Sequence, residues 1–328
     1  MELYTIAEFD TYAREPVIAP MKDGSLICVF LTGGPTEPDN ENFAAVSRSR
    51  DGGKSWTEPT PLFTHPKRGA WCTDIFTDGE YPVAAVCLYN ADSHYRELTT
   101  YFSESRDNGA TWSAPKSIKG HLDGCSLRRG VTLSNGDVLY PLYWQEAVSD
   151  YNWPDNWREH LEIWRFCSGV GIKAKGEDVF YRYGYLADPE LSFWEPNAVE
   201  ADPGHIIMYL RNRSRVLYVT ESFDYGRSWS EPRPTGIPHS DSKTTVMKVG
   251  GDIIMINNAI GRGRTHLELT KSKNGLDFSH VCFIGEPEDN FYYPHAFADE
   301  EKRLLYVAYE NSKLHRLAIF TFGELGIG

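Results

Sequence analysis

The chain has 328 residues, of which 41 % are hydrophobic and 13 % aromatic, so it can bury a substantial core. Its formal net charge of −13 argues against nucleic acids and anionic membranes as partners, because both are themselves negatively charged. No apolar run reaches transmembrane length and MELYTIAEFD is not a signal peptide, so we expect no membrane insertion, and either a cytoplasmic protein or a secreted one without its leader.

A tight-turn signal recurs between apolar runs along the whole chain. Gly supplies the positive φ that such hairpins need, and five of the turns contain it. The turns are Lys22–Ser25, Thr77–Glu80, Ser134–Asp137, Asp202–His205, Val249–Asp252 and a weaker Asp299–Lys302. Their glycines stand at positions 24, 79, 136, 204 and 251, which gives gaps of 55, 57, 68 and 47 residues.

A second signal, Ser-x-Asp-x-Gly-x-Ser/Thr-Trp, repeats with the same period. It occurs at Ser49–Trp56, Ser105–Trp112 and Ser222–Trp229, with a degraded copy at Ser272–Phe278. In such a turn Ser and Asp can bond backbone amides, Gly bends the chain and Trp packs back on the sheet. The starts are separated by 56, 117 and 50 residues, so the long gap leaves room for one repeat without a box.

Both series predict six four-stranded units, and repeats of this length are typical of propeller blades. No helical period or linker interrupts them. The sequence therefore predicts an all-β fold, a single six-bladed β-propeller over residues 1–328. We expect it to be closed by pairing of the N-terminal LYTIAEF with the C-terminal LHRLAIFTF.

A ring of polar and aromatic residues is predicted where the inner strands begin, about eight to ten residues before each tight turn. A purely structural propeller would not need arginines, a glutamate and tyrosines around one channel, so this convergence indicates a functional site. Counting back from the turns gives Arg14, Trp71, Arg128 with Arg129, Glu195, His239 with Ser240, and Tyr292 with Tyr293.

Glu195 and Arg211 lie at equal distance from Pro203, the centre of one predicted hairpin. They should therefore lie within one residue of facing each other, and opposed side chains on antiparallel strands are about 5 Å apart. The pair is either a cross-strand ion pair or part of the site.

The boxes resemble the Asp-boxes, or bacterial neuraminidase repeats, of sialidases, and the resemblance spans the whole chain. In that family the boxes are structural turns away from the active site. The resemblance implies a sialidase-like six-bladed propeller whose chemistry lies at the strand ends described above.

The resemblance also implies a carboxylate-binding set of arginines. Arg14-Glu15-Pro16 is similar to the family's Arg-Ile-Pro motif, although its middle residue differs. Arg211 resembles the second arginine of the set, and Arg264 the third, with Arg262 as the alternative. Arg128 and Trp71 complete the predicted substrate-binding residues, and Arg129 could reinforce the same anionic pocket.

Three further residues resemble the catalytic groups of sialidases. Tyr293 in YYPHAF resembles the nucleophile, with Tyr292 as the alternative, and Glu195 resembles the glutamate that activates it. The family's acid/base lies on the loop after the second strand of blade one, here GGPTEPDNEN. Asp39 is our prediction for that role, with Glu37 and Glu41 as alternatives.

The residue types suit a sugar whose anomeric carbon carries a carboxylate. Guanidinium forks hold a carboxylate bidentately, and a tyrosine nucleophile avoids the repulsion that a carboxylate nucleophile would meet. A tyrosine pKa of about 10 then requires a neighbouring base. The six cysteines form no CxxC pair and the ten histidines show no metal-ligand spacing, so we expect no metal and no cofactor.

The predicted function is a retaining exo-glycosidase of sialidase type that acts on a glycan with a terminal α-linked sialic acid or a related carboxylated sugar. The alternatives are a glycosidase or polysaccharide lyase of the same fold acting on a rhamnoside, arabinan or uronate, and a non-catalytic sugar-binding propeller. Four tryptophans between residues 144 and 164 indicate either a loop that stacks on sugars or one packed on the rim.

Overall fold

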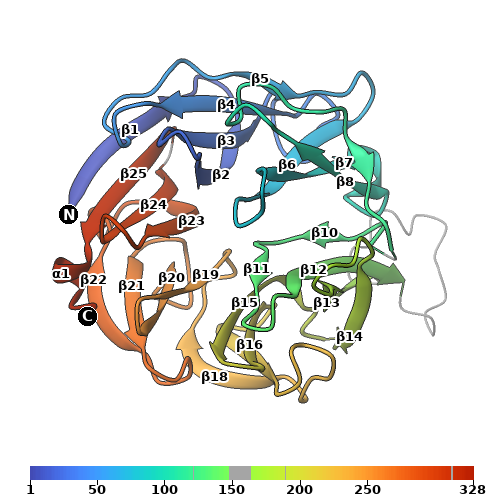
Figure 1. The fold of residues 1–328 in the computed structure, drawn as a ribbon, viewed down its shortest axis with the longest axis vertical. Helices are drawn as coiled ribbons and strands as arrows, with labels where there is room; N and C mark the ends of the chain where they lie inside the picture. The colour runs from blue at the N-terminus through green and yellow to red at the C-terminus, as the bar shows by residue number, and fades with distance from the viewer. Residues whose placement is uncertain (121, 148–163, 189, 312) are drawn as a thin grey trace.

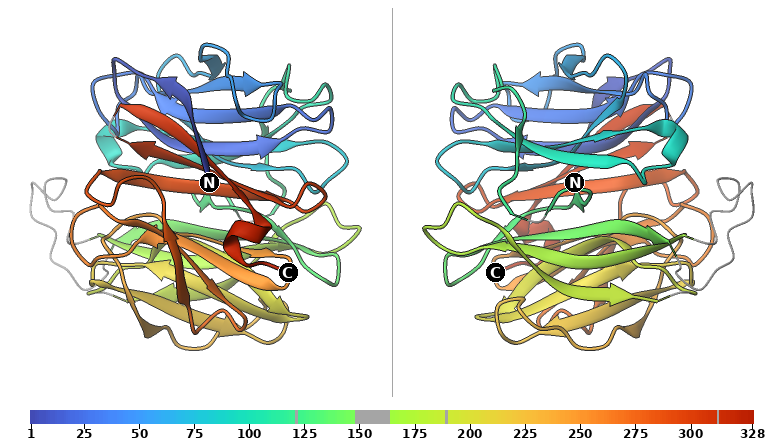
Figure 2. Two further views of the ribbon diagram at one scale, coloured as in Figure 1. Left: turned by 90° about the vertical axis from the view of Figure 1, so that its left-hand side faces the viewer. Right: turned by 90° about the vertical axis from the view of Figure 1, so that its right-hand side faces the viewer.

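The described residues form six antiparallel sheets arranged in a ring around a common axis (Figure 1). The computed structural model describes residues 1–120, 122–147, 164–188, 190–311 and 313–328. Seen edge-on, the strands of each sheet run between the two faces of the ring (Figure 2). This is the predicted six-bladed β-propeller.

The first three blades are built from consecutive strands, the innermost first. Blade one contains β2 (Ala13–Pro20), β3 (Leu26–Thr32), β4 (Phe43–Ser49) and β5 (Thr60–Phe63). Blade two contains β6 (Gly69–Phe76), β7 (Val83–Tyr89), β8 (Leu98–Glu104) and β9 (Lys116–Ser117), with a 3₁₀ turn η1 (Ala91–Ser93) after β7. Blade three contains β10 (Ser126–Leu127) and β11 (Val131–Thr132), which both pair with β12 (Val138–Ala147), then β13 (Trp164–Lys173) and β14 (Tyr181–Ala187).

The last three blades follow the same order until the final strand. Blade four contains β15 (Trp194–Asp202), β16 (His205–Arg211), β17 (Val216–Ser222) and β18 (Arg233–Pro238). Blade five contains β19 (Thr245–Val249), β20 (Asp252–Asn258), β21 (Leu267–Ser272) and β22 (Ser279–Phe283). Blade six contains β23 (Phe291–Asp299), β24 (Leu304–Asn311), β25 (Leu314–Thr321) and β1 (Glu2–Glu8), and a short helix α1 (Phe322–Leu325) follows β25.

The apolar core lies between neighbouring blades. The second strands are apolar on both faces, as in LICVFLT of β3, because each of their faces packs against another sheet. One cluster joins blades one and two through Val17, Ile27, Ala70 and Ala84. Burying apolar surface in this way contributes roughly 25 cal/mol per Å², so each blade is stabilised mainly by its neighbours in the ring.

The predicted boxes connect the third and fourth strands of blades one, two, four and five. In the first box the Asp51 carboxylate accepts hydrogen bonds from the Lys54 and Ser55 amides at 3.1 and 2.9 Å. The Trp56 indole donates to the Gly53 carbonyl at 2.9 Å, which turns the ring back onto the blade. Blade three has no box between β13 and β14, which confirms the expected gap.

The ring is closed in blade six, where the N-terminal strand β1 pairs antiparallel with β25. Glu2 faces Ile319 and Tyr4 faces Leu317 in this register. Both chain ends therefore lie on the same blade (Figure 1). The predicted closure is confirmed.

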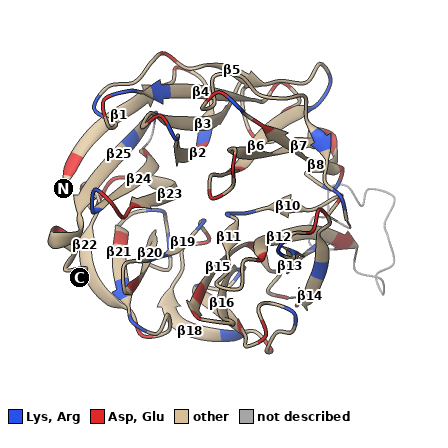
Figure 3. Ribbon diagram, viewed as in Figure 1, with Lys and Arg blue, Asp and Glu red and all other residues tan. Residues whose placement is uncertain are grey.

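Three general properties of the described residues complete the fold. None of the helices has the length and apolar character that crossing a membrane requires. The cysteines are free thiols, and all but Cys282 are buried. Acidic and basic positions are interspersed around the ring, so neither sign occupies one side alone (Figure 3).

Candidate active site

The first strands of blades one, four and six share a local distortion. Glu15, Glu195 and Tyr293 each precede a proline and have φ values of 51, 46 and 48°. At each of them the register shifts, so that two residues of the first strand oppose one residue of the second. Such a bulge redirects a side chain, and left-handed residues cost about 1–3 kcal/mol and cluster at functional sites.

These three side chains line one cavity of about 150 Å³ at the start of the inner strands. Its wall is predominantly aromatic, which suits the apolar faces of a sugar ring. The other lining residues are Glu37, Trp71, Tyr95, Leu98, Ser126, Tyr143, Trp144, Gln145, Phe166 and Trp194.

Arg128 lies between β10 and β11 and contacts several residues that line this cavity, although it is not a lining residue itself. Its guanidinium donates to Glu15 at 3.1 Å, to Glu195 at 2.8 Å and to the Tyr143 hydroxyl at 3.1 Å. It also lies 4.7 Å from the centre of the Trp71 ring. Arg128 is only 2 % exposed, so this is a buried ion-pair network that links blades one, three and four.

Glu195 and Arg211 form the cross-strand ion pair that the hairpin symmetry predicts. Trp194 is paired with Arg211 in the sheet, so Glu195 is one residue from the facing position. One Arg211 nitrogen donates to Glu195, and its Nε donates to Asp241 at 2.9 Å. Burial opposes ionisation of Glu195, but the charges of Arg211 and Arg128 outweigh it and lower its pKa to about 2.

Two more arginines flank the tyrosine pair of blade six. The Arg14 guanidinium carbon lies 4.5 Å from the Tyr292 ring centre and 5.8 Å from that of Tyr293. The corresponding distances of Arg264 are 5.0 Å to both rings. Arg264 also donates to the Asp241 carbonyl at 3.1 Å, whereas Arg262 is exposed. Arg14 and Arg264 thus lie beside the Tyr293 ring, and the charge of Arg211 also acts on this tyrosine, whose pKa is raised by burial. The three arginines are not themselves among the residues that line the cavity.

Of the three candidate acids on the loop after β3, Glu37 is the one that lines the cavity. Its carboxylate accepts hydrogen bonds from the hydroxyls of Tyr12 at 2.6 Å and Tyr95 at 2.5 Å. Desolvation and the nearby charge of Glu15 raise its pKa, although the two tyrosine hydrogen bonds and the charge of Arg14 oppose the shift.

Asp39 does not line the cavity, contrary to its predicted position. The Asp39 carboxylate accepts the Glu41 amide at 2.8 Å and the Asp39 amide donates to Asn42 at 2.9 Å, so the residue stabilises the loop turn. Glu41 is exposed.

The sequence analysis missed four charged residues of the site. Glu15 was visible only as a departure from a motif, and Asp241, Lys243 and Glu310 were not selected. Lys243 is buried with its ammonium group 3.9 Å from Glu15, and Glu310 lies 3.9 Å from Arg14. Burial raises the pKa of Glu310 to about 8, although Arg14 and Arg264 oppose the shift.

Two other expectations have different outcomes. Arg129 does not reinforce the mouth, because it lines a separate cavity formed farther along the inner strands. Of the predicted tryptophan-rich segment, Trp144 lines the mouth cavity, whereas Trp153 and Trp157 lie outside the described residues.

Residues 83–307 match the BNR repeat-like domain, which is more than half of the chain. The chain belongs to the BNR repeat-like family. A protein of this kind from Bacteroides fragilis, named sialidase, is 21 % identical over 92 % of this chain. The chain spans only 60 % of the length of that relative.

Solved structures of sialidases share the fold of this family member. The Hadza microbial sialidase Hz136 superposes with a TM-score of 0.78 at 15 % identity, over 95 % of this chain and 66 % of its own. The K499G mutant of NanB sialidase from Streptococcus pneumoniae gives 0.75 at 13 % identity, over 98 and 71 %. A protein of unknown function from Dyadobacter fermentans gives 0.75 at 15 % identity, over 97 % of both chains. The fold is therefore a sialidase-like propeller.

Proposed function

We propose that this protein is a retaining exo-glycoside hydrolase of sialidase type. Its substrate is a glycan that ends in an α-linked sialic acid or a related carboxylated sugar. The observation that carries the proposal is the placement of three arginines from blades one, four and five around Tyr293, with Glu195 beside them.

The arginines bind the substrate carboxylate. Arg14 and Arg264 flank the Tyr293 ring from two sides, and Arg211 comes from the strand opposite Glu195. A guanidinium offers a planar fork of donors that matches a carboxylate, and a cavity that excludes water strengthens the contact. Binding the carboxylate there places the anomeric carbon next to the tyrosine.

Tyr293 attacks the anomeric carbon while its hydroxyl proton passes to Glu195. In the free protein Glu195 is a weak base, because Arg211 and Arg128 lower its pKa. A substrate carboxylate competes for Arg211, and the loss of this partner raises the pKa of Glu195 towards a useful value. Substrate binding therefore prepares the base.

Glu37 supplies the proton that the leaving sugar needs. Its raised pKa lets the carboxyl group hold a proton to higher pH than an exposed glutamate does, and breaking the glycosidic bond transfers that proton to the leaving oxygen. The ionised Glu37 then takes a proton from water, whose oxygen attacks the anomeric carbon. The bond between that carbon and Tyr293 breaks, and the phenolate takes its proton back from Glu195. Configuration is retained because the anomeric carbon is attacked twice.

The test is release of 4-methylumbelliferone from its α-sialoside, with the α-L-rhamnoside, α-L-arabinofuranoside and β-glucuronide assayed in parallel. We expect turnover of the sialoside by the native protein and its loss in Arg211→Ala. The matched control is Arg213→Ala, which changes an exposed arginine two residues away. Turnover of another glycoside alone, or an unaffected Arg211→Ala enzyme, would reject the proposal.

A further inference from the structure

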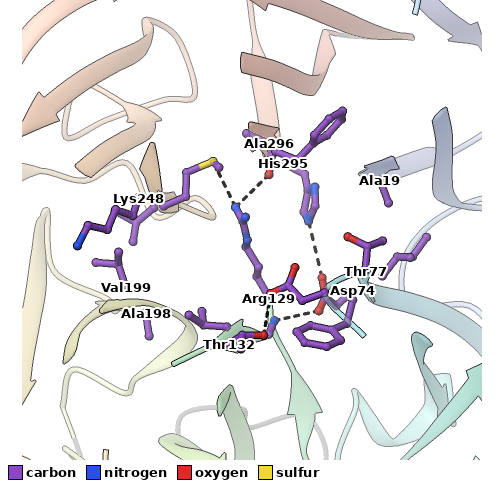
Figure 4. A pocket seen from close by; sticks show the side chains of 18 of the residues that line it. Ala19, Asp74, Thr77, Arg129, Thr132, Ala198, Val199, Lys248, His295 and Ala296 are labelled. Atoms are coloured by element: carbon purple, nitrogen blue, oxygen red, sulfur yellow. Dashed lines mark hydrogen bonds and ion pairs between the residues drawn. The ribbon is translucent and has the colours of Figure 1, made fainter. Parts of the chain in front are cut away.

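A second cavity, of about 250 Å³, lies on the same axis but farther along the inner strands (Figure 4). All six blades contribute to it through residues that follow the mouth residues in sequence. In blade four, for example, Glu195 lines the mouth whereas Ala198, Val199 and Glu200 line this cavity. Apolar side chains, including Phe76, make up much of its wall. We call it the axial cavity.

Arg129 is the central charged group of the axial cavity (Figure 4). One terminal nitrogen, Nη1, donates to the Ala296 carbonyl at 3.0 Å and to the Met247 sulfur at 3.3 Å. Among the described residues no carboxylate lies within ion-pair distance of Arg129, and its Nη2 and Nε have no hydrogen-bond acceptor. Its neighbour Arg128, by contrast, is paired with two carboxylates. Arg129 is half-buried, and burial lowers its pKa although the charges of Asp74 and Asp78 oppose the shift, so a ligand carboxylate at hydrogen-bond distance would supply a closer anion.

Asp74 and His295 face each other on the wall of the same cavity (Figure 4). The Ile18 amide donates to His295 Nδ1 at 3.3 Å, which leaves the proton of the neutral ring on Nε2. This buried Nε2 lies 3.9 Å from Asp74 and has no hydrogen-bond partner in the described parts of the chain. The other Asp74 oxygen accepts the Gly130 amide at 2.9 Å. A donor and an acceptor are therefore available together, which is what a hydroxyl group requires.

The remaining charged groups that line the cavity already have partners. Asp78 accepts the Thr132 hydroxyl at 2.8 Å, and Lys248 donates to the Ala201 carbonyl at 2.8 Å. Glu200 accepts three hydrogen bonds, from the Ser134 amide and hydroxyl and from the Gly204 amide, at 2.7, 2.8 and 3.0 Å. The groups with unused capacity are thus the Arg129 guanidinium and the Asp74–His295 pair.

We propose that the axial cavity is a second ligand site, which binds a small organic acid with a hydroxyl group beside its carboxylate. Arg129 binds the carboxylate, Asp74 and His295 bind the hydroxyl, and the apolar wall covers the carbon atoms. This site is independent of the glycosidase site proposed above, because the two cavities share no lining residue.

The sulfur contact of Met247 provides a local probe. The chain has five methionines, so a protein labelled with ¹³C at the methionine methyls gives five signals, of which Met247 reports on Arg129. Lactate, propionate and lactamide are of nearly equal size. Propionate lacks the hydroxyl group and lactamide lacks the carboxylate, so the three compounds test the two parts of the site separately. We expect saturable movement of the Met247 signal with lactate, about three- to tenfold weaker binding of propionate, and no saturation with lactamide.

Variants test whether the lactate-dependent shift of the Met247 signal arises from binding in the axial cavity. Arg129→Gln should weaken lactate binding at least about tenfold, and Arg211→Ala should leave it unchanged because that residue belongs to the mouth. Arg129→Lys keeps the charge and should retain measurable binding, so it serves where Arg129→Gln does not fold. Equal binding of lactamide, or a response lost in Arg211→Ala and kept in Arg129→Gln, would overturn the proposal. Movement by sodium chloride equal to that by sodium lactate would mean an adventitious ion only, and would overturn it as well.

Discussion

Arg128 and Glu195 form a buried ion pair of 2.8 Å that joins blade three to blade four. The same guanidinium reaches Glu15 of blade one at 3.1 Å, so one side chain connects carboxylates from opposite sides of the cavity floor. Charges removed from water in this way are tolerated only together, because each supplies the solvation that the others have lost.

Replacing Arg128 should therefore destabilise the ring. We expect Arg128→Met to lower the free energy of unfolding by about 3–5 kcal/mol at pH 8, because it leaves buried carboxylates with fewer cationic partners. At pH 5 the loss should be smaller, since without the charge of Arg128 the pKa of Glu195 rises and protonation relieves the unpaired charge. Guanidinium titrations measure both values. Arg227→Met, which breaks a partly exposed pair with Asp137, is the control and should cost about 1 kcal/mol or less.

The two adjacent tyrosines of blade six should differ sharply in their effect on catalysis. Tyr293→Phe removes the proposed nucleophile and should reduce kcat on a sialoside at least about a thousandfold. Tyr292→Phe keeps the ring beside Arg14 and Arg264 and should retain activity within about tenfold. Steady-state assays of both variants decide which tyrosine is the nucleophile. A much larger loss of kcat in Tyr292→Phe than in Tyr293→Phe would assign the reaction to Tyr292.

Glu37 should control the alkaline side of the pH profile. Its pKa is raised, so the protonated acid is present below that pKa and is lost as the pH increases through it. Activity should therefore fall as the pH increases through this pKa. Glu37→Gln should abolish this pH dependence and lower the rate about 10²–10⁴-fold. The measurement is kcat/KM against pH with a natural glycan. Asp39→Asn, the control on the same loop, should keep this pH dependence, and its loss there would contradict the assignment.

The box of blade four should matter for stability alone. Asp224 accepts the Arg227 and Ser228 amides at 3.0 and 2.8 Å and the Ser228 hydroxyl at 2.6 Å. Asp224 also accepts the Ser222 hydroxyl at 2.8 Å. Asp224→Ala removes all four acceptor contacts at an exposed turn, so we expect a loss of about 1–2 kcal/mol with kcat unchanged. Thermal unfolding measures the loss against exposed Glu231→Ala, which should have an effect below about 0.5 kcal/mol. A large fall in kcat would show that the box influences the site.

The propeller could be predicted because its signals are local in the chain. Five of the six tight turns contain glycine, and each box satisfies its own amides, as Asp51 does with Lys54 and Ser55. The distance back from the turns points to Glu195 and Tyr293, which line one cavity, and to Arg14, which lies beside the Tyr293 ring. These predictions required only strand geometry.

The rest of the site depends on contacts between distant segments. Glu37 rather than Asp39 reaches the cavity because Tyr12 and Tyr95 hold its carboxylate, and neither contact is visible in the loop sequence. Counting eight to ten residues back from the tight turn of blade three does not distinguish Arg128 from Arg129. Arg128 contacts the residues of the mouth cavity, whereas Arg129 lines the axial cavity, and both lie where the inner strand of blade three is interrupted between β10 and β11. The catalytic and binding roles of all these residues stay predictions.

The repeated bulge before proline makes the mouth modular. Blades one, four and six present Glu15, Glu195 and Tyr293 from the same backbone geometry. The chemistry at each bulge is therefore decided by one side chain, while the hydrogen bonding of the strand stays the same. Leu31, Arg211 and Glu310 on the second strands pair with the residues that immediately precede the bulge, and they form a matching set. A new specificity on this scaffold can therefore arise by exchanging residues at six equivalent points without any change of loop length or blade packing.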